Sequence, residues 1–218
     1  MFIGHFGVAM AAKRVAPAAS LGTLVMAAQL ADGLWPIFVL LGVERARIDP
    51  GITRVTPLDF AYYPFSHSLL ADIGWAAVFT VIYGAVRKDW RTAAWLGALV
   101  LSHWVLDLVV HRPDLPVWPG GPKVGFGLWN SLPLTLLIEF ALFVGGAYGY
   151  LIATRPRDRL GTALFGAFVL TLAALYLAAV FGPPPPSVQA LAITGLAGWL
   201  FVAWGYWIDR HRVPAMCV

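Results

Sequence analysis

Six apolar segments of about 20 residues, separated by short charged or Gly- and Pro-rich stretches, constrain this chain more than any other feature of its sequence. A helix of that length crosses the hydrocarbon core of a bilayer, which is about 30 Å thick. Charged residues make up 12% of the chain and hydrophobic residues 60%, with a mean hydropathy of +0.75. Because soluble domains carry about 25% charged residues, the sequence predicts an all-α, polytopic integral membrane protein.

We expect a single integral membrane domain over residues 1–218, in which a short N-terminal helix, residues 1–12, precedes six spans. At 1.5 Å per residue this helix reaches only about 18 Å, too short to cross a bilayer. The first span should kink or end near Pro36, because proline removes a backbone donor. Ser66 should cap the second span. The predicted spans cover residues 20–42, 66–86, 92–111, 131–153, 160–181 and 188–208.

The third predicted span carries a polar stripe. His103, Asp107 and His111 fall at about 0°, 40° and 80° around a helix axis, and therefore on one face. An ionisable side chain in hydrocarbon costs about 2.5–3.5 kcal/mol, so such a stripe should face inward. His103 and Asp107 are one turn apart, about 6 Å, which lets both reach one cation. His111 is about 12 Å from His103 and is expected to serve a second metal, the substrate or the interface.

Other spans also carry ionisable residues. Asp32, His67 and Glu139 lie on three further predicted spans, and such intramembrane groups are rare and usually functional. Together with the stripe they predict one shared polar site. Asp72 could orient a ligand or pair with a loop arginine. The single cysteine, Cys217, excludes a disulfide framework or a cysteine-based zinc site, so a metal would be held by histidine and carboxylate.

The charge distribution predicts an orientation. The net charge of +4 comes from basic residues in short loops, which does not suggest a nucleic-acid partner. Counted on alternate sides of the six spans, ten Lys and Arg residues share the side of Lys13 and Arg14, against five opposite. The positive-inside rule then places both termini in the cytoplasm. The polar site should open outward, beneath loops 43–65 and 112–129.

Four short motifs carry a resemblance to a known family. They are Gly4-His5, Asp32, Ser66-His67-Ser68-Leu69-Leu70 and Ser102-His103-Trp104-Val105-Leu106-Asp107. In these motifs the chain resembles the membrane-bound metal-dependent hydrolases, whose bacterial members are described as LexA-binding and associated with the inner membrane. The resemblance covers about the first 110 residues and implies a bacterial inner-membrane location.

That family is in turn distantly similar to the zinc-dependent phospholipase C and nuclease group, in which a helical cage of His and Asp holds zinc. The resemblance implies zinc and the ligands His5, Asp32, His67, His103 and Asp107. Two departures stand out. The family's Asp-x-Asp-His cluster is replaced by residues 31–35, Ala-Asp-Gly-Leu-Trp, and its Arg-Gly before Thr-His-Ser by Tyr-Pro-Phe at 63–65. Asp59, His111 or Glu139 would have to fill the vacancy.

The function expected from these residues is metal-dependent hydrolysis of an ester or phosphoester in a lipid-like substrate at the membrane. A divalent ion lowers the pKa of bound water towards about 7, and Glu139 or Asp72 would act as general base. An alternative is a non-catalytic membrane protein, either a metal or proton carrier or an accessory subunit of a membrane complex. A third is a haem protein with His67 and His103 as axial ligands.

Overall fold

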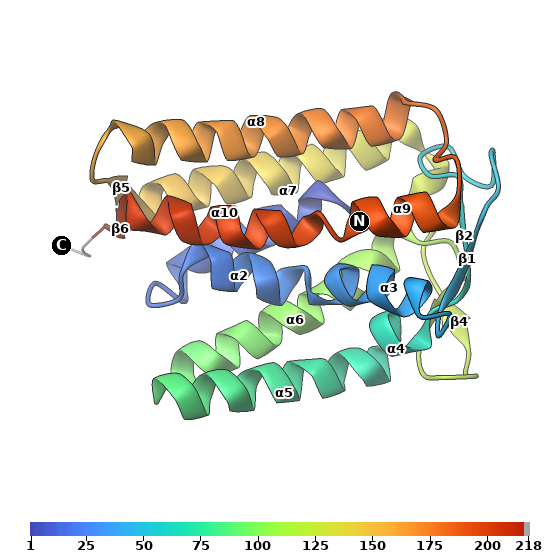
Figure 1. Cartoon of the computed structure of the whole chain (residues 1–218), viewed down its shortest axis with the longest axis horizontal. Helices are drawn as coiled ribbons and strands as arrows, with labels where there is room; N and C mark the ends of the chain where they lie inside the picture. The colour runs from blue at the N-terminus through green and yellow to red at the C-terminus, as the bar shows by residue number, and fades with distance from the viewer. Residues whose placement is uncertain (216–218) are drawn as a thin grey trace.

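The computed structural model, which describes residues 1–215, is a bundle of long helices with three two-stranded sheets at its ends (Figure 1). The expected all-α architecture is confirmed. The helices are α1 Ile3–Ala11, α2 Leu21–Ala28, α3 Leu30–Leu40, α4 Pro64–His67, α5 Leu69–Arg87, α6 Trp90–Val110, α7 Leu132–Ala153, α8 Arg159–Phe181, α9 Val188–Gly195 and α10 Gly198–Arg210, with 3-10 turns η1 Ala12–Arg14 and η2 Leu128–Asn130.

The long helices are suited to a membrane. Within the described residues, five helical segments are long and apolar enough to cross one, and α2 with α3 makes a sixth if this pair, bent by 57°, is one span. Their outer faces carry exposed apolar side chains such as Val81, Leu137 and Leu170. Such faces suit hydrocarbon rather than water. The bounds of α5 to α8 lie close to those predicted.

Two predicted details were wrong. The first span breaks at Gln29, and Pro36 lies inside α3. The second span is capped by Ser68, which accepts from the amide of Ala71, because Ser66 belongs to the separate short helix α4. The sixth predicted span agrees with the segment Val188–Arg210, within which α9 and α10 are separated by a turn. Ser or Asp side chains also cap α2, α6, α8 and α9, for example Asp89 at α6.

The connecting loops at one end of the bundle are folded. Loop 43–65 forms the antiparallel hairpin β1–β2, in which Arg45 pairs with Tyr62 and Ile48 with Leu58. Loop 112–129 carries the small hairpin β3–β4. At the opposite end β5 pairs with β6 (Figure 1). The strands are β1 Arg45–Ile48, β2 Leu58–Tyr62, β3 Leu115–Pro116, β4 Lys123–Val124, β5 Thr154–Pro156 and β6 Arg212–Pro214.

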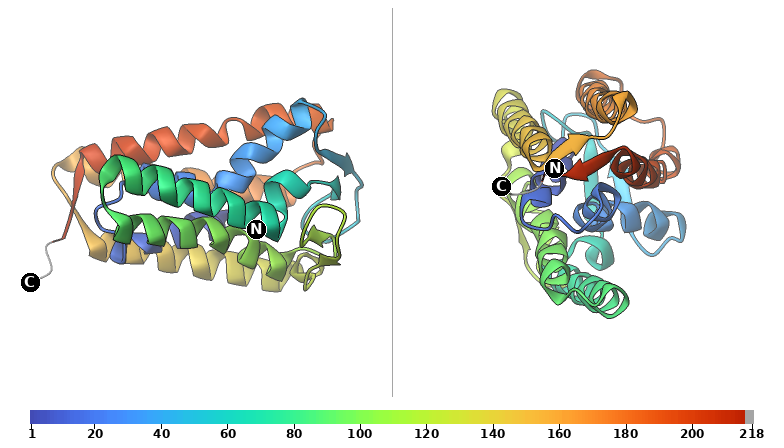
Figure 2. Two further views of the ribbon diagram at one scale, coloured as in Figure 1. Left: turned by 90° about the horizontal axis from the view of Figure 1, so that it is seen from below. Right: turned by 90° about the vertical axis from the view of Figure 1, so that its left-hand side faces the viewer.

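Helix α1 lies inside the bundle, as the end-on view in Figure 2 shows. Ile3, Phe6 and Met10 are buried in the main core, where Phe6 meets Phe168 edge to face with ring centroids 6.1 Å apart. Close packing of α1 on α7 depends on small residues. A Cβ atom at Gly146 would lie only 1.9 Å from the carbonyl oxygen of Gly7. The two backbones therefore touch directly.

Candidate metal centre

Asp107 is the centre of the polar site. It lies on α6 with His103 one turn before and His111 one turn after, and all three side chains are buried. The predicted inward-facing stripe is thus confirmed. Two more histidines reach the same carboxylate from other helices, His5 from α1 and His67 from α4. The amino group of Met1 also bonds Asp107 Oδ1.

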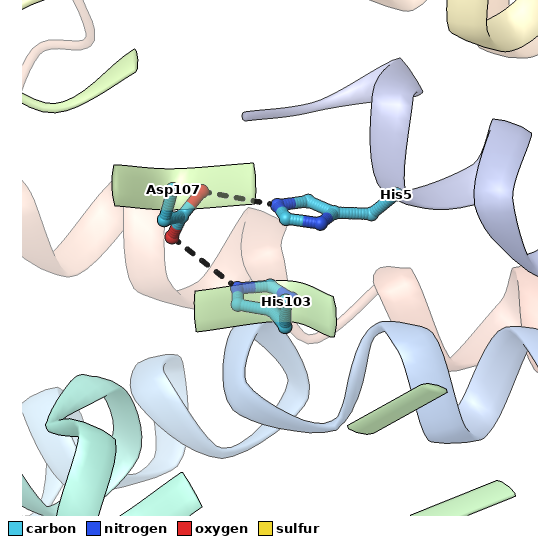
Figure 3. Close-up of side chains that lie close together, drawn as sticks. All are labelled: His5, His103 and Asp107. Carbon is cyan, nitrogen blue, oxygen red and sulfur yellow. Dashed lines mark hydrogen bonds and ion pairs between the residues drawn. The ribbon is translucent and has the colours of Figure 1, made fainter. Parts of the chain in front are cut away.

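Four imidazole Nε2 atoms surround this carboxylate. His5 Nε2 is 3.1 Å from Asp107 Oδ1. The Nε2 atoms of His103, His111 and His67 lie 3.4, 3.6 and 3.9 Å from Oδ2. Figure 3 shows His5 and His103 approaching the two oxygens of Asp107 from different helices. Four of the five histidines of the chain therefore converge on one carboxyl group.

Asp32 brings a second carboxylate to the same place. Its Oδ1 is 3.4 Å from His67 Nε2 and 3.8 Å from His103 Nε2. Ligand atoms at about 2.0–2.1 Å from a tetrahedral zinc ion lie about 3.3–3.4 Å apart. The four separations linking Asp32 and Asp107 to His67 and His103, 3.4 to 3.9 Å, are close to that spacing. His103 therefore lies between the two carboxylates, and each of them has an oxygen within 3.8 Å of its Nε2.

The break between α2 and α3 supplies part of this geometry. The carbonyl of Ala28, at the end of α2, accepts a hydrogen bond of 2.8 Å from Nδ1 of His103. Asp32 lies in the first turn of α3, immediately beyond the break. An unbroken helix would use the carbonyl of Ala28 within the helix. The interruption therefore orients one candidate ligand and places another.

Helix α1 places His5 as expected. Both oxygens of Glu139, on α7, accept hydrogen bonds from the backbone amides at the start of α1, those of Phe2 and Gly4. The imidazole of His5 stacks on that of His103, with ring centroids 3.8 Å apart and planes 5° from parallel. The N-terminal helix is therefore inserted in the bundle, and His5, which the resemblance implies as a ligand, lies beside His103.

The hydrogen bonds at Nδ1 distinguish the four histidines. Nδ1 of His103 bonds Ala28, Nδ1 of His67 bonds Ser66 Oγ at 2.7 Å, and Nδ1 of His111 bonds Asp114 at 2.9 Å. In a neutral imidazole, an acceptor at Nδ1 leaves Nε2 as a lone pair. Nδ1 of His5, by contrast, has no hydrogen-bond partner. Since His5 Nε2 lies within hydrogen-bond distance of Asp107, His5 is best placed to donate to Asp107.

The surroundings of His103 test whether a cation fits. Within residues 1–215, Nε2 of His103 is buried without a hydrogen-bond partner, although oxygens of Asp107 and Asp32 lie 3.4 and 3.8 Å away. With the Nδ1 proton donated to Ala28, a neutral His103 would present a lone pair to the lone pairs of two carboxylates. A positive charge between them, either a metal ion or a second proton on the imidazole, removes that repulsion. The residues therefore fit a divalent metal.

The candidate ligands form two groups that share His103. His5, His103 and Asp107 make one candidate metal-binding cluster, and Asp32, His67 and His103 make another. His111 belongs to neither. It contacts Asp107, Asp114 and the ring of Trp129, whose centroid is 4.3 Å from that of His111. The rings of His67 and His103 meet edge to face, 5.2 Å apart, rather than across an open plane, so they do not suit a haem.

The remaining predicted residues have other contacts. Glu139 is not a free carboxylate, because it binds the amides of α1. Asp59 pairs with Arg112 rather than filling the vacant ligand position. Asp72 is buried, and neither of its oxygens has a hydrogen-bond partner, so the expected pairing with a loop arginine is not present among the described residues.

Sequence reasoning missed Glu44 and Asp114, which support the site from outside. Glu44 bonds Ser66, and Asp114 bonds both His111 and Arg112. Burial lowers the pKa of Arg112, but the hydrogen bond to Asp114 and the charges of Asp114 and Asp59 together raise it above its usual value. The spacing His-x-x-Asp at 111–114 could have indicated Asp114, whereas no local signal marks Glu44.

Asp32 is the accessible edge of the centre. Its side chain is 40% exposed, against 5% or less for His67, His103 and Asp107. An apolar groove with a volume of about 480 Å³ is lined by Phe38 of α3, Phe65 of α4 and Trp75 of α5, among others. It shares α3 and α4 with the centre, since these helices carry Asp32 and His67, although no candidate ligand lines it.

The fold and the site together define a helical protein of membrane type with a buried His/Asp centre suited to a divalent cation. Comparison of the chain with protein-family models, with curated proteins and with solved structures finds no match.

Proposed function

We propose that this protein is a membrane-embedded, metal-dependent hydrolase whose ligands are His67, His103, Asp32 and Asp107. The observation that carries the proposal is the buried Nε2 of His103, which lies 3.4 and 3.8 Å from oxygens of two carboxylates and, within the described residues, has no hydrogen-bond partner. Zinc suits this donor set of imidazole and carboxylate. The resemblance noted in the sequence points to the same chemistry.

In such a site a divalent ion acidifies water and thereby supplies a nucleophile at neutral pH. His5 donates to Asp107 and fixes its orientation. Asp72 is the better of the two expected general bases, because its oxygens are free of hydrogen bonds while Glu139 is engaged by α1. His111 joins the centre to Asp114 at the rim.

The surroundings favour a lipid-like ester or phosphoester as substrate. Asp32, the exposed ligand, lies on the same helix as Phe38, which lines the apolar groove. A hydrocarbon chain in that groove would place its polar end near Asp32 without leaving the bilayer. A water-soluble substrate would gain no binding free energy from the apolar side chains that line this groove.

A carrier of metal ions or protons is the second candidate, and one observation favours it. Two spans are interrupted, α2–α3 and α9–α10, and the first interruption lies at the centre itself. Discontinuous helices around a mid-membrane ion site are typical of secondary transporters. Metal or proton flux into liposomes that contain the purified protein would favour this function over hydrolysis.

The experiment that tests the metal is a zinc titration of detergent-purified protein. Wild type should bind zinc, and His103→Ala or Asp107→Ala should release it, because loss of one ligand severely lowers affinity. His211→Ala is the matched control, since His211 lies outside the centre and bonds Asp158. Wild-type protein that neither contains zinc nor takes it up would remove the basis of the hydrolase proposal.

We also propose that the protein lies in a bacterial inner membrane with both termini in the cytoplasm. The support is the unequal distribution of Lys and Arg, ten on one side of the spans and five on the other. Loops 43–65 and 112–129 then face outward, above His67 and His111.

A further inference from the structure

We infer that Glu44 is a positioning residue that sets the tautomer of His67 through the hydroxyl of Ser66. It thereby makes Nε2 of His67 available to a cation. This inference rests on the proposed metal centre, but it concerns hydrogen bonds that exist whether or not a metal is bound. Glu44 lies between α3 and β1, outside the metal ligands, and its side chain is buried.

Glu44 is surrounded by donors. Its Oε1 accepts the backbone amides of Phe65 and Ser66, each at 2.8 Å. Its Oε2 accepts the hydroxyl of Ser66 at 2.6 Å. An ionised carboxylate has no proton to give, so the hydroxyl proton of Ser66 must point at Glu44. The short distance is typical of a hydroxyl donating to a charged acceptor.

The direction of that bond fixes the next one. Because the proton of Ser66 is committed to Glu44, the oxygen of Ser66 presents a lone pair to Nδ1 of His67, 2.7 Å away. His67 must therefore carry its proton on Nδ1 and donate it to Ser66. In the neutral imidazole Nε2 is then a lone pair, which faces Asp32 Oδ1 at 3.4 Å and Asp107 Oδ2 at 3.9 Å.

The tautomer of His67 depends on the side chain of Glu44, whereas the tautomer of His103 is set by a backbone carbonyl. Nδ1 of His103 meets the carbonyl of Ala28, which can only accept. Nδ1 of His67 meets a hydroxyl, which can either accept or donate. Without a carboxylate to hold its proton, Ser66 could donate to His67. His67 would then carry its proton on Nε2, where it would bond Asp32 and exclude a metal.

Glu44→Gln tests this directly, because it keeps the shape and reverses the polarity. The amides of Phe65 and Ser66 need the carbonyl oxygen of the new glutamine, so its NH2 group must face Ser66 Oγ. Ser66 then accepts from Gln and donates to His67. Nitrogen-15 NMR of histidine-labelled, metal-free protein should find the His67 proton on Nδ1 in wild type and on Nε2 in Glu44→Gln.

Zinc affinity provides a second readout. Glu44→Gln should raise the zinc Kd by about 10- to 100-fold, as loss of an outer partner of a ligating histidine usually does. Glu44→Asp, which keeps an acceptor at this position, should recover most of the affinity. In a Ser66→Ala background Glu44→Gln should have no further effect, because the hydroxyl that transmits the polarity is gone.

Asp209→Asn is the control for loss of a buried carboxylate. Asp209 bonds Lys13 and Tyr150 at the opposite end of the bundle, so its loss should change stability without moving the His67 proton. A wild-type His67 with a proton on Nε2, or a folded Glu44→Gln variant with wild-type tautomer and zinc affinity, would overturn the inference. Failure of wild type to bind zinc would instead refute the metal centre, while the NMR result still decides the role of Glu44.

Discussion

The contact between α1 and α7 can be tested with two adjacent glycines. In Gly146→Ala the added methyl group would lie 1.9 Å from the carbonyl oxygen of Gly7, whereas in Gly145→Ala it would have no neighbour within 4 Å. Both substitutions replace glycine in the same helix and gain about 1 kcal/mol of helix propensity. Any difference between them therefore reports the packing of α1 alone.

The size of the effect follows from the geometry. Ordinary contact begins at 3.4 Å, so α1 must withdraw from α7 by about 1.5 Å, because a backbone oxygen cannot rotate away. If α1 moves as a unit, His5 moves with it by about 1.5 Å relative to α7, and the distance of 3.1 Å from His5 Nε2 to Asp107 Oδ1 on α6 changes by at most that amount. Overpacking costs about 1–3 kcal/mol and the gain in helix propensity is common to both variants, so we expect Gly146→Ala to be less stable than Gly145→Ala by about 1–3 kcal/mol.

Two measurements report the displacement of α1 in Gly146→Ala. Unfolding in detergent should rank Gly145→Ala above wild type and Gly146→Ala below it. Carbethoxylation read by mass spectrometry should leave His5 protected in wild type and Gly145→Ala, because only 1% of its surface is exposed, and should label it in Gly146→Ala. Equal stability of the two variants, with His5 protected in both, would refute the close packing of α1 on α7.

Three further results are expected. Phe168→Ala should lower the free energy of unfolding by about 3–5 kcal/mol, measured in detergent, since Phe168 is fully buried in the main core. Hydrogen bonds from His211 and the amide of residue 161 lower the pKa of Asp158 in the folded protein. The stability that these hydrogen bonds provide is therefore present above the unfolded pKa of about 3.8 and is lost as pH falls through the lower folded pKa. In Asp158→Asn the free energy of unfolding should depend less on pH in that range. In a background without the native cysteine, Arg54→Cys and Lys123→Cys should react with an impermeant thiol reagent on intact cells; reaction only after lysis would invert the proposed orientation.

Local patterns were enough to predict the residues that meet at the centre. The helical spacing of His103, Asp107 and His111 determined which face of α6 is polar, and the cost of burying charge in hydrocarbon determined that this face turns inward. The same cost indicated that Asp32 and His67 would join them. His5 was expected there mainly from the family resemblance, because the length of the first helix excludes a full span but leaves a position on the membrane surface open.

What the sequence did not reveal depends on contacts between distant segments. Pro36 is the expected helix breaker, yet the break lies at Gln29, where Ala28 bonds a histidine on α6 rather than its own helix. Glu44 is one of several charges in a polar loop, and only the folded hairpin brings it to Ser66. No periodicity or cap motif records either contact.

The position of α1 also bears on the order in which the protein is built. The amides of Phe2 and Gly4 find their acceptor in Glu139, a residue synthesised more than 130 positions later. An apolar segment with unpaired amides cannot remain in hydrocarbon, and about 14 Å of helix cannot span it. We therefore expect the first helix to take its place in the bundle only after α7 has entered the membrane, and the histidine that it carries to join the centre at that point.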